Sequence, residues 1–539
     1  MKKNFETVGV MIDVSRNAVM SMDGLKRFLP LLKKMGYNMV MLYTEDTYEV
    51  DGEPYFGYMR GRYSKAELKE LDAFAASLGI TMIPCIQTLA HISTFLKWGT
   101  SPHVLDGRVP VECEGILSID DERTYELIDH MFASVSECFA SRKIHIGMDE
   151  AHMLGRGKHL DLHGYEPVEV LMRRHLDRIS EIAKKYDYEL MIWSDMFFKS
   201  WNNGEYYIPK REVPKEIIEN FPDSVIPVYW DYYHCDEQSY SDMIENHQQI
   251  SDKTWFAGGN WSWCGFIPHN RFTLKSMIPA MDACRKHKIR HVFFAMWGDN
   301  GGECSHFAQL PSLYYLGQYA KGITDEEKIK AGFKWLIGID FDEFINIDCP
   351  NDVVPHNSGP KNPSKYMLYS DYFNDFLDYT VKLGEGYRYA DFAEQLRATA
   401  KKSRTYGYVF DTAAKLCDVM AIKYELGLRT RKAYEAGDKA ELERLAKNEY
   451  VEVVKRIEVF ARAFEKQWFK DNKPHGFDVQ DHRIGALLRR TNSCRKRILD
   501  YVNGKIDRIE ELDEKLLPYG RKGYEQSIDS NRDATVNTP

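Results

Sequence analysis

Two adjacent carboxylic acids, Asp149 and Glu150, follow an apolar stretch in the segment KIHIGMDEAH (143–152). Apolar residues alternate through 144–148, which predicts a buried strand. Neighbouring carboxylates at the end of such a strand repel each other and lose hydration, so they need a functional reason to be there. One acid can donate a proton while the other stabilises positive charge, as glycoside cleavage requires.

Neighbours in an extended strand point to opposite sides, so the two acids can serve one site only where the strand bends into its loop. Adjacent residues are also poorly placed to flank a bond symmetrically. We therefore expect unequal roles, with Glu150 as the acid/base and Asp149 acting on part of the substrate. The alternative is structural: one acid caps the following helix and the other is solvated.

Polar and aromatic residues also follow the other apolar runs of the first 320 residues. They are Asp13, Arg16, Tyr43, Glu45, Asp46, Tyr48, Gln87, His91, Trp193, Asp195, Trp230, Asp231, Tyr232, Tyr233, Asn260, Trp261, Trp263, Trp297, Asp299 and Asn300. Aromatic rings stack on the C–H faces of sugars, while carboxylates, amides and arginine bind hydroxyl groups. The alternative is that these tryptophans only fill space at the ends of the runs. Their presence after four consecutive runs disfavours that alternative.

The elements that must position these residues repeat along the chain. Strands are predicted at 8–14, 38–43, 80–86, 144–148, 189–193, 225–230, 254–259 and 291–297. Helices are predicted between them at 25–36, 65–79 (with Ser64 as N-cap), 121–139, 167–187, 214–221, 239–250 and 272–288, and from about Pro311. Eight such units with apolar strands predict a closed (β/α)8 barrel, in which chemistry lies at the carboxyl ends of the strands. A doubly wound open sheet is the competing architecture, but the first strand has no Gly-rich turn after it.

Helical patterns dominate after about residue 324, which predicts an all-helical C-terminal domain. We therefore expect a catalytic barrel at 1–323 and a helical domain at 324–539.

Composition narrows the class of protein. A formal charge of −9 over 539 residues argues against nucleic-acid binding. No segment has the apolar length of a membrane span, and the N-terminus does not resemble a signal peptide. The ten cysteines contain no CxxC pair and are expected to be buried thiols. A cytoplasmic protein that contacts neither nucleic acid nor membrane is expected.

Several motifs together resemble glycoside hydrolase family 20, the β-N-acetylhexosaminidases. HIGMDE is similar to the His-x-Gly-x-Asp-Glu signature of that family. The likeness covers roughly residues 5–320 and includes DVSR on the first strand, His91, the strand-end tryptophans and WGDNGGE. The chain also resembles bacterial exo-β-N-acetylglucosaminidases that begin directly with the barrel, without the small α/β domain found in most members, and that carry a helical region behind it.

The resemblance implies substrate-assisted hydrolysis of a terminal, non-reducing GlcNAc or GalNAc. The 2-acetamido oxygen of the substrate attacks the anomeric carbon and forms an oxazolinium ion, so configuration is retained. Glu150 would be the general acid and then the base, and Asp149 would hold the acetamido N–H and balance positive charge. His91, with Asp46 or Glu45 behind it, would orient Glu150.

The same resemblance assigns residues to the sugar. Arg16 and Asp299 would bind the 3- and 4-hydroxyls, Trp193, Trp230 and Trp261 would enclose the acetamido methyl, and Trp297 would lie under the ring. The family holds the acetamido carbonyl with a tyrosine, commonly from the loop after the seventh strand, yet GGNWSWCGF contains none. Tyr232 or Tyr233 would replace it. The resemblance implies no cofactor and no metal, and it suggests a homodimer.

Three alternatives remain open at this point. A barrel glycosidase with a protein nucleophile would need a second carboxylate ~5 Å from the acid, for which Asp299 or Asp195 could serve. A metal hydrolase would use His145, Asp149, His152 and His91, although their spacing fits no standard ligand set. A non-catalytic sugar-binding barrel would have no use for a buried proton donor.

Overall fold

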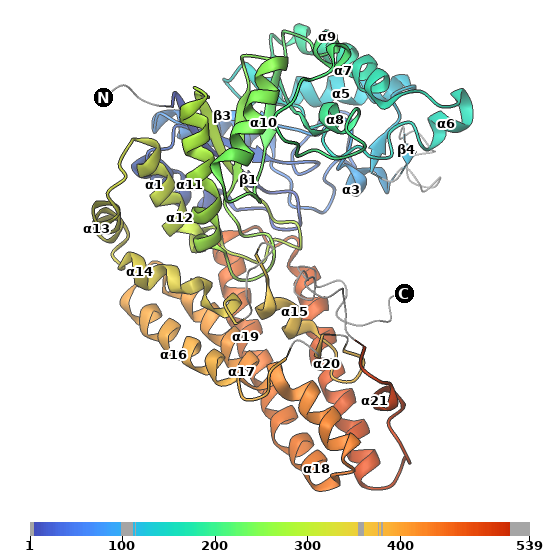
Figure 1. Ribbon diagram of the computed structural model, residues 1–539, viewed down its shortest axis with the longest axis vertical. Helices are drawn as coiled ribbons and strands as arrows, with labels where there is room; N and C mark the ends of the chain where they lie inside the picture. The colour runs from blue at the N-terminus through green and yellow to red at the C-terminus, as the bar shows by residue number, and fades with distance from the viewer. Residues whose placement is uncertain are drawn as a thin grey trace.

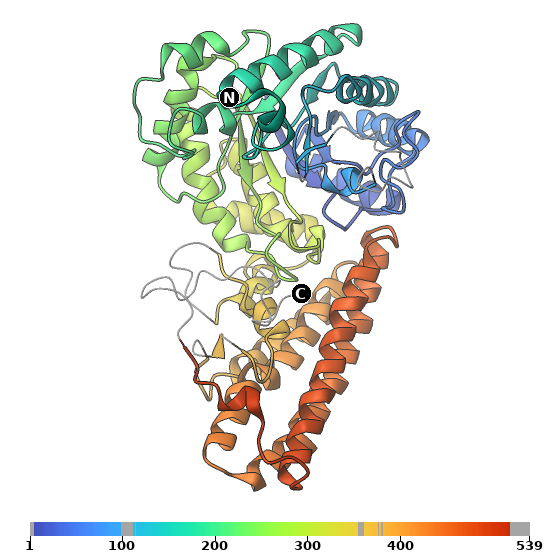
Figure 2. The ribbon, with the colours of Figure 1, turned by 90° about the vertical axis from the view of Figure 1, so that its right-hand side faces the viewer.

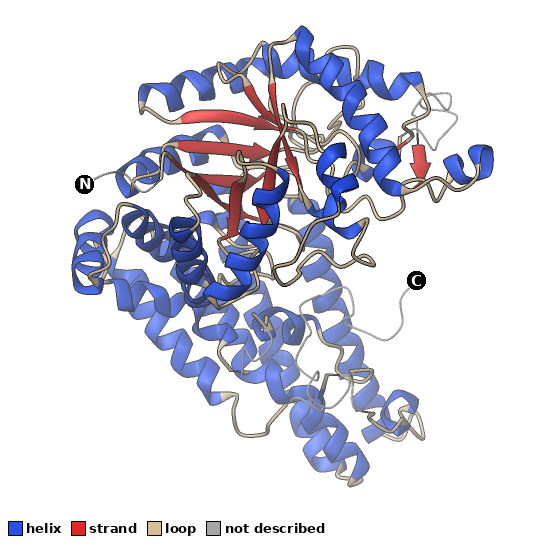
Figure 3. Cartoon of the chain, turned by 45° about the horizontal axis from the view of Figure 1, so that its top comes forward, coloured by secondary structure: helices blue, strands red, loops and turns tan. Residues whose placement is uncertain are grey.

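A computed structural model describes residues 5–98, 111–113, 115–353, 360–375, 377–378 and 381–517. Eight parallel strands form a closed barrel in the order β1-β10-β9-β8-β7-β6-β3-β2 (Figure 3). Their bounds are β1 (Thr7–Asp13), β2 (Met39–Tyr43), β3 (Thr81–Cys85), β6 (Lys143–His145), β7 (Glu189–Trp193), β8 (Ile226–Trp230), β9 (Trp255–Gly259) and β10 (His291–Met296). The predicted (β/α)8 barrel is confirmed.

Helices cover the outside of the barrel and follow the strands in turn. The long ones are α1 (Met22–Met35), α2 (Lys65–Ser77), α5 (Glu122–Ser136), α7 (Val168–Lys185), α10 (Glu237–Ile250), α11 (Asn270–Lys286) and α12 (Leu310–Ala320). The predicted N-cap Ser64 is confirmed, because its side chain and that of Glu67 form a reciprocal capping box. Gly36, in the left-handed region at φ 115°, ends α1 as predicted.

Shorter elements lie in the loops at the carboxyl ends of the strands. They are α3 (Ser93–Leu96), the hairpin of β4 (Val111–Cys113) and β5 (Ile116–Leu117), α6 (Lys158–His163), α8 (Asp195–Lys199), α9 (Lys215–Asn220) and the 3-10 helix η1 (His306–Gln309). These loops surround the mouth where the strand-end residues meet.

The barrel interior is filled by side chains from alternate strand positions. Met11, Met41, Met191, Val228 and Phe293 are all fully buried there. The strands are in parallel register, for example Met11 with Met41 and with Ala295. This packed interior supports the polar residues at the strand ends from below.

The chain after α12 is helical among the described residues, as expected (Figure 1). Its elements are α13 (Glu326–Ile337), α14 (Phe341–Phe344), the 3-10 helix η2 (Ile345–Asn351), α15 (Pro363–Tyr369), α16 (Tyr387–Lys402), α17 (Gly407–Glu435), α18 (Lys439–Lys447), α19 (Glu449–Asp471), α20 (Phe477–Val502) and α21 (Glu510–Asp513). Figure 2 shows α20 reaching up to the barrel with its N-terminal end.

One hydrophobic core passes from the barrel helices into the helical region. Phe28 packs on Phe307, Phe307 on Tyr406, and Tyr406 on Phe344. The backbone is also joined, since Lys473 N donates to Val19 O at 2.7 Å. The division into domains at residues 323 and 324 stays a prediction.

No described helix is both long and apolar enough to cross a membrane. The ten cysteines are free thiols, seven of them buried and three partly buried. The prediction of buried thiols is thus confirmed for seven of the ten cysteines.

Candidate active site

The backbone bends sharply just after β6. The regular strand ends at His145, three residues earlier than predicted, and Gly147, Met148 and Glu150 have φ angles of 71°, 71° and 49°. A Cβ atom on Gly147 would lie 1.8 Å from Gln87 Oε1, so only glycine fits there. Because of this bend, the two neighbouring carboxylates both border the same pocket instead of pointing to opposite sides.

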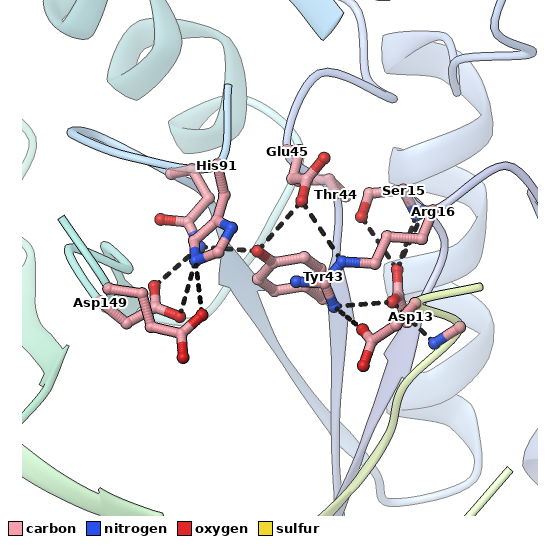
Figure 4. Close-up of polar contacts among 12 residues, drawn as sticks. Asp13, Ser15, Arg16, Tyr43, Thr44, Glu45, His91 and Asp149 are labelled. Carbon is pink, nitrogen blue, oxygen red and sulfur yellow. Dashed lines mark hydrogen bonds and ion pairs between the residues drawn. The ribbon is translucent and has the colours of Figure 1, made fainter. Parts of the chain in front are cut away.

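Asp149 lies at the base of the site and is 9% exposed. Its Oδ1 accepts a hydrogen bond from Gln87 Nε2 at 3.1 Å, and its Oδ2 lies 3.2 Å from His91 Nε2 (Figure 4). Burial raises the pKa of Asp149, but the charge and hydrogen bond of His91 and the bond from Gln87 lower it more, so its pKa falls below the ordinary value. Asp149 is therefore an anion at neutral pH.

His91 joins the two carboxylates. Its Nε2 is also 3.6 Å from Glu150 Oε2, and the Glu150 side chain is 44% exposed. Burial lowers the pKa of His91, but the charge of Asp149 and the hydrogen bond to it together outweigh this and raise the pKa to about 9. The result is a cation between a buried anion and an acid that reaches solvent.

Asp195 supports this arrangement from beneath the loop. It accepts a hydrogen bond from Glu150 N at 3.1 Å and pairs with Lys199 at 3.1 Å. Burial, together with the charge of Asp149, raises the pKa of Asp195 to about 6. Asp195 is fully buried, so it cannot contact a ligand in the pocket.

Arg16 is the cation on the opposite side of the pocket (Figure 4). Its Nη1 lies 2.8 Å from Asp299 Oδ1 and 3.1 Å from Asp13 Oδ2, and its Nε lies 3.7 Å from Glu45 Oε1. Asp13 also accepts hydrogen bonds from the backbone N–H groups of Ser15 and Arg16, which fixes the turn after β1. The guanidinium is therefore held by acids on several strands.

Aromatic rings flank the same guanidinium. Its carbon lies 5.0 Å from the centre of the Tyr43 ring and 4.8 Å from that of Trp297. Glu45 accepts a hydrogen bond from Tyr43 Oη at 3.2 Å, and burial raises the pKa of Glu45 to about 7 despite Arg16. Arg16 is thus fixed by contacts on its face and its edge.

These groups border one pocket at the mouth of the barrel. Its lining residues are Arg16, Asp149, Glu150, Trp193, Trp230, Tyr232, Tyr233, Trp263, Trp297 and Asp299. Nine of the ten are residues that the sequence predicted for the site. Their roles toward a ligand remain predictions.

Trp263 occupies the place predicted for Trp261. The two indoles are stacked with centroids 3.9 Å apart, and Trp261 Nε1 donates to Tyr232 O at 2.8 Å. Trp261 therefore forms a layer behind Trp263 and does not line the pocket. Since the two residues are separated by only Ser262, the sequence pattern could not distinguish the ring that lines the pocket from the ring behind it.

Asp46 is also placed differently from the prediction. It pairs with Arg60 at 2.9 Å and is 1% exposed. Glu45 contacts Arg16 and Tyr43, while His91 takes its charged contacts from Asp149 and Glu150. The supporting acid expected behind His91 is thus replaced by direct contact with the two carboxylates.

The metal-hydrolase alternative is not supported by the placement of its residues. His145 lies inside the barrel, where its Nδ1 accepts from Gly147 N at 3.1 Å and burial lowers its pKa to about 3. Ligand atoms of His91, Asp149 and Glu150 do lie within 4.8 Å of one another. However, neither His145 nor His152, which this alternative needs, belongs to that group.

The helical region anchors the loop that carries Asp299. Lys365 Nζ lies 2.6 Å from Glu303 Oε1 and 3.1 Å from Asn300 O. Arg483 Nη1 contacts the same two atoms at 2.9 and 2.7 Å. Glu303 and Lys365 are 3% and 0% exposed, so this is a buried ion group between the two parts of the chain.

Two family models match the chain. Residues 5–220 match the model described as "Glycosyl hydrolase family 20, catalytic domain", and residues 340–530 match "Glycoside Hydrolase 20C C-terminal domain". Hexosaminidase D of Bos taurus is 24% identical over 44% of this chain and 65% of its own length. Hexosaminidase D of Homo sapiens is 24% identical over 39% of this chain and 41% of its own length.

Among solved structures, a chitobiase of Flavobacterium johnsoniae has a TM-score of 0.49 at 15% identity, covering 94% of this chain and 74% of its own. The chain spans less than two thirds of the length of each of the two Hexosaminidase D relatives. The two family models nevertheless match most of it, one over residues 5–220, which include Arg16, Asp149 and Glu150, and one over the helical region behind the barrel. The chain belongs to glycoside hydrolase family 20.

Proposed function

We propose that this protein is an exo-acting, retaining β-N-acetylhexosaminidase that removes a terminal GlcNAc or GalNAc. One observation carries the proposal: a buried, ionised Asp149 and a solvent-reaching Glu150 border the same aromatic pocket. Membership of family 20 and the names of the Hexosaminidase D relatives support the same activity.

In the first step, Glu150 donates its proton to the glycosidic oxygen as the bond to the anomeric carbon breaks. The carbonyl oxygen of the substrate's own acetamido group forms the new bond to that carbon and gives an oxazolinium ion. Asp149 accepts the acetamido N–H and stabilises the positive charge that grows on this group. In the second step Glu150 takes a proton from water, which attacks the same carbon and reopens the ring.

Other pocket residues would bind the sugar. Arg16 and Asp299 would bind the 3- and 4-hydroxyls, so they would decide between GlcNAc and GalNAc. Trp297 would lie under the ring. The acetamido methyl would contact the remaining tryptophans, Trp193, Trp230 and Trp263, and Tyr232 or Tyr233 would donate to its carbonyl.

A mechanism with a protein nucleophile is less well supported. Asp195 is fully buried under the loop, and Asp299 is bound to Arg16 at 2.8 Å. A purely sugar-binding role would leave the charged contacts of His91 with both acids without a use.

The test compares two aryl glycosides that differ only at C2. We expect hydrolysis of 4-nitrophenyl N-acetyl-β-D-glucosaminide and no comparable hydrolysis of 4-nitrophenyl β-D-glucoside, which lacks the internal nucleophile. A thiazoline that mimics the cyclised intermediate should inhibit. Equal rates on the two glycosides would contradict the proposal.

We also propose a reducing, intracellular location, which is supported by ten cysteines without a disulfide. The homodimer stays a prediction.

A further inference from the structure

A second group of histidines and carboxylates lies outside the pocket, on the loop between β6 and α7. The short helix α6 carries His159 and His163, which are four residues apart and so share one face. Asp120 approaches them from the segment before α5. One ligand atom from each of these three residues lies within 4.8 Å of the other two.

His159 is the centre of this group and is only 2% exposed. Its Nδ1 lies 2.6 Å from Asp120 Oδ2, and the same oxygen lies 3.9 Å from His163 Nε2. On the other side of the ring, Nε2 lies 3.1 Å from Glu166 Oε2. This nitrogen is buried and makes no hydrogen bond of good geometry. The Nδ1 edge of the ring therefore faces Asp120 and His163, and the Nε2 edge faces Glu166.

The surrounding contacts hold these groups in place. Arg174 lies 3.2 Å from Asp120 Oδ1 and 3.1 Å from Glu166 Oε2, which leaves Asp120 Oδ2 directed at His159. The buried Glu112 accepts hydrogen bonds at 3.0 Å from the backbone N–H groups of Gly157 and His159. The start of α6 is thus fixed before any ligand binds.

We propose that Asp120, His159 and His163 bind a divalent transition-metal ion of the zinc type. The ion would be held by Asp120 Oδ2, His159 Nδ1 and His163 Nε2, with water in a fourth position. Imidazole and carboxylate donors together favour zinc over calcium or magnesium. The ion replaces the proton between His159 Nδ1 and Asp120 Oδ2, and that proton is released to solvent.

The partner of His159 Nε2 supports this assignment. Histidines that bind metals commonly donate their other ring N–H to a carboxylate, which fixes the ring orientation. Glu166 Oε2 lies 3.1 Å from Nε2 without a hydrogen bond of good geometry, so a small turn of this carboxylate would bring it to that position. The ion would join α6 to Asp120 and so fasten the loop in which Glu150 lies. This proposal does not depend on the hydrolytic function.

The experiment titrates ZnCl2 into the full-length, chelator-treated protein by isothermal calorimetry. We expect one equivalent to bind, more tightly at pH 8 than at pH 6 because a proton is released. His163→Gln should weaken binding about tenfold or more, as should Asp120→Asn. His130→Gln is the matched control, since this histidine is 47% exposed, faces Glu53 and lies on α5. Bound Co²⁺ should give visible d–d absorption in the wild type and the control.

A second arm separates this site from the pocket. Glu150→Gln removes a carboxylate that lies beside His91 in the pocket. If zinc binds at α6, this change should leave the titration unchanged. His163 is half exposed, and equal thermal midpoints without metal will show that its variant is folded. Three results would overturn the proposal: no binding by the wild type, equal affinity in His163→Gln and the wild type, or binding lost in Glu150→Gln and kept in His163→Gln.

Discussion

Two clusters of this protein combine histidine with carboxylates at similar distances but in different surroundings. The pocket cluster is His91, Asp149 and Glu150, and the loop cluster is Asp120, His159 and His163. In the pocket cluster a buried anion keeps the imidazole protonated, and aromatic side chains enclose the acids. In the loop cluster the acids are balanced by Arg174 at the surface. The same residue types thus suit proton transfer in one place and metal binding in the other.

The largest expected effect in the pocket cluster is that of changing Glu150. Glu150→Gln keeps the shape of the side chain but cannot donate a proton. We expect kcat to fall by about 10²- to 10⁴-fold, with binding of a thiazoline inhibitor retained. Steady-state kinetics on the N-acetylated aryl glycoside measures the loss. Near wild-type turnover would remove Glu150 from the mechanism.

Asp149→Asn tests the buried charge. The amide can still accept a hydrogen bond but cannot stabilise the oxazolinium ion, so we expect a loss of about 2–4 kcal/mol in transition-state stabilisation. The measurement is kcat/KM, with circular dichroism as the control for folding. A change below twofold would show that the charge of Asp149 is not used.

His91→Gln tests the cation between the acids. Loss of its charge-assisted contacts should cost about 1.5–3 kcal/mol in kcat/KM. Because the folded pKa of His91 is raised from 6.5 to about 9, its contribution to stability is complete below about pH 6.5 and is lost as pH rises through about 9. Activity should fall over the same alkaline range in the wild type.

The variant should lose that part of the pH profile. An unchanged alkaline limb in His91→Gln would assign the limb to another group.

Arg174→Gln, in the loop cluster, has the smallest expected effect. It tests whether that cluster contributes less to stability than the pocket cluster does. Its side chain is 41% exposed, so its ion pairs with Asp120 and Glu166 are screened by water. We expect the free energy of unfolding to fall by about 0–1 kcal/mol, with kcat/KM unchanged. Urea denaturation measures the first quantity. A loss of several kcal/mol would mean that the loop cluster is as strongly coupled to the fold as the pocket cluster.

Much of the barrel could be predicted because its signals are local. Alternating apolar residues mark the strands, and Ser64 and Gly36 mark helix ends through their own side-chain or backbone preferences. Once the barrel was predicted, its geometry brought Arg16, Glu150 and Asp299 together although they are far apart in the chain.

The remaining details depend on contacts between distant segments. The bend at Gly147 is set by Gln87 on another loop, so the early end of β6 was not visible in the sequence. Asp46 pairs with Arg60, and Trp261 supports Trp263. His159 and His163 were not predicted as a site, although their spacing of four on a helix was a usable signal.

The buried ion group of Glu303, Lys365 and Arg483 has a consequence for how this protein can be altered. A chain that stopped at residue 323 would lack Lys365 and Arg483, so Glu303 and the loop that carries Asp299 would lose the contacts that hold them. Fusing this barrel to the helical region of another protein would preserve the ion group only if that region supplied two cations at the same places. The barrel and the helical region therefore have to be altered as one unit.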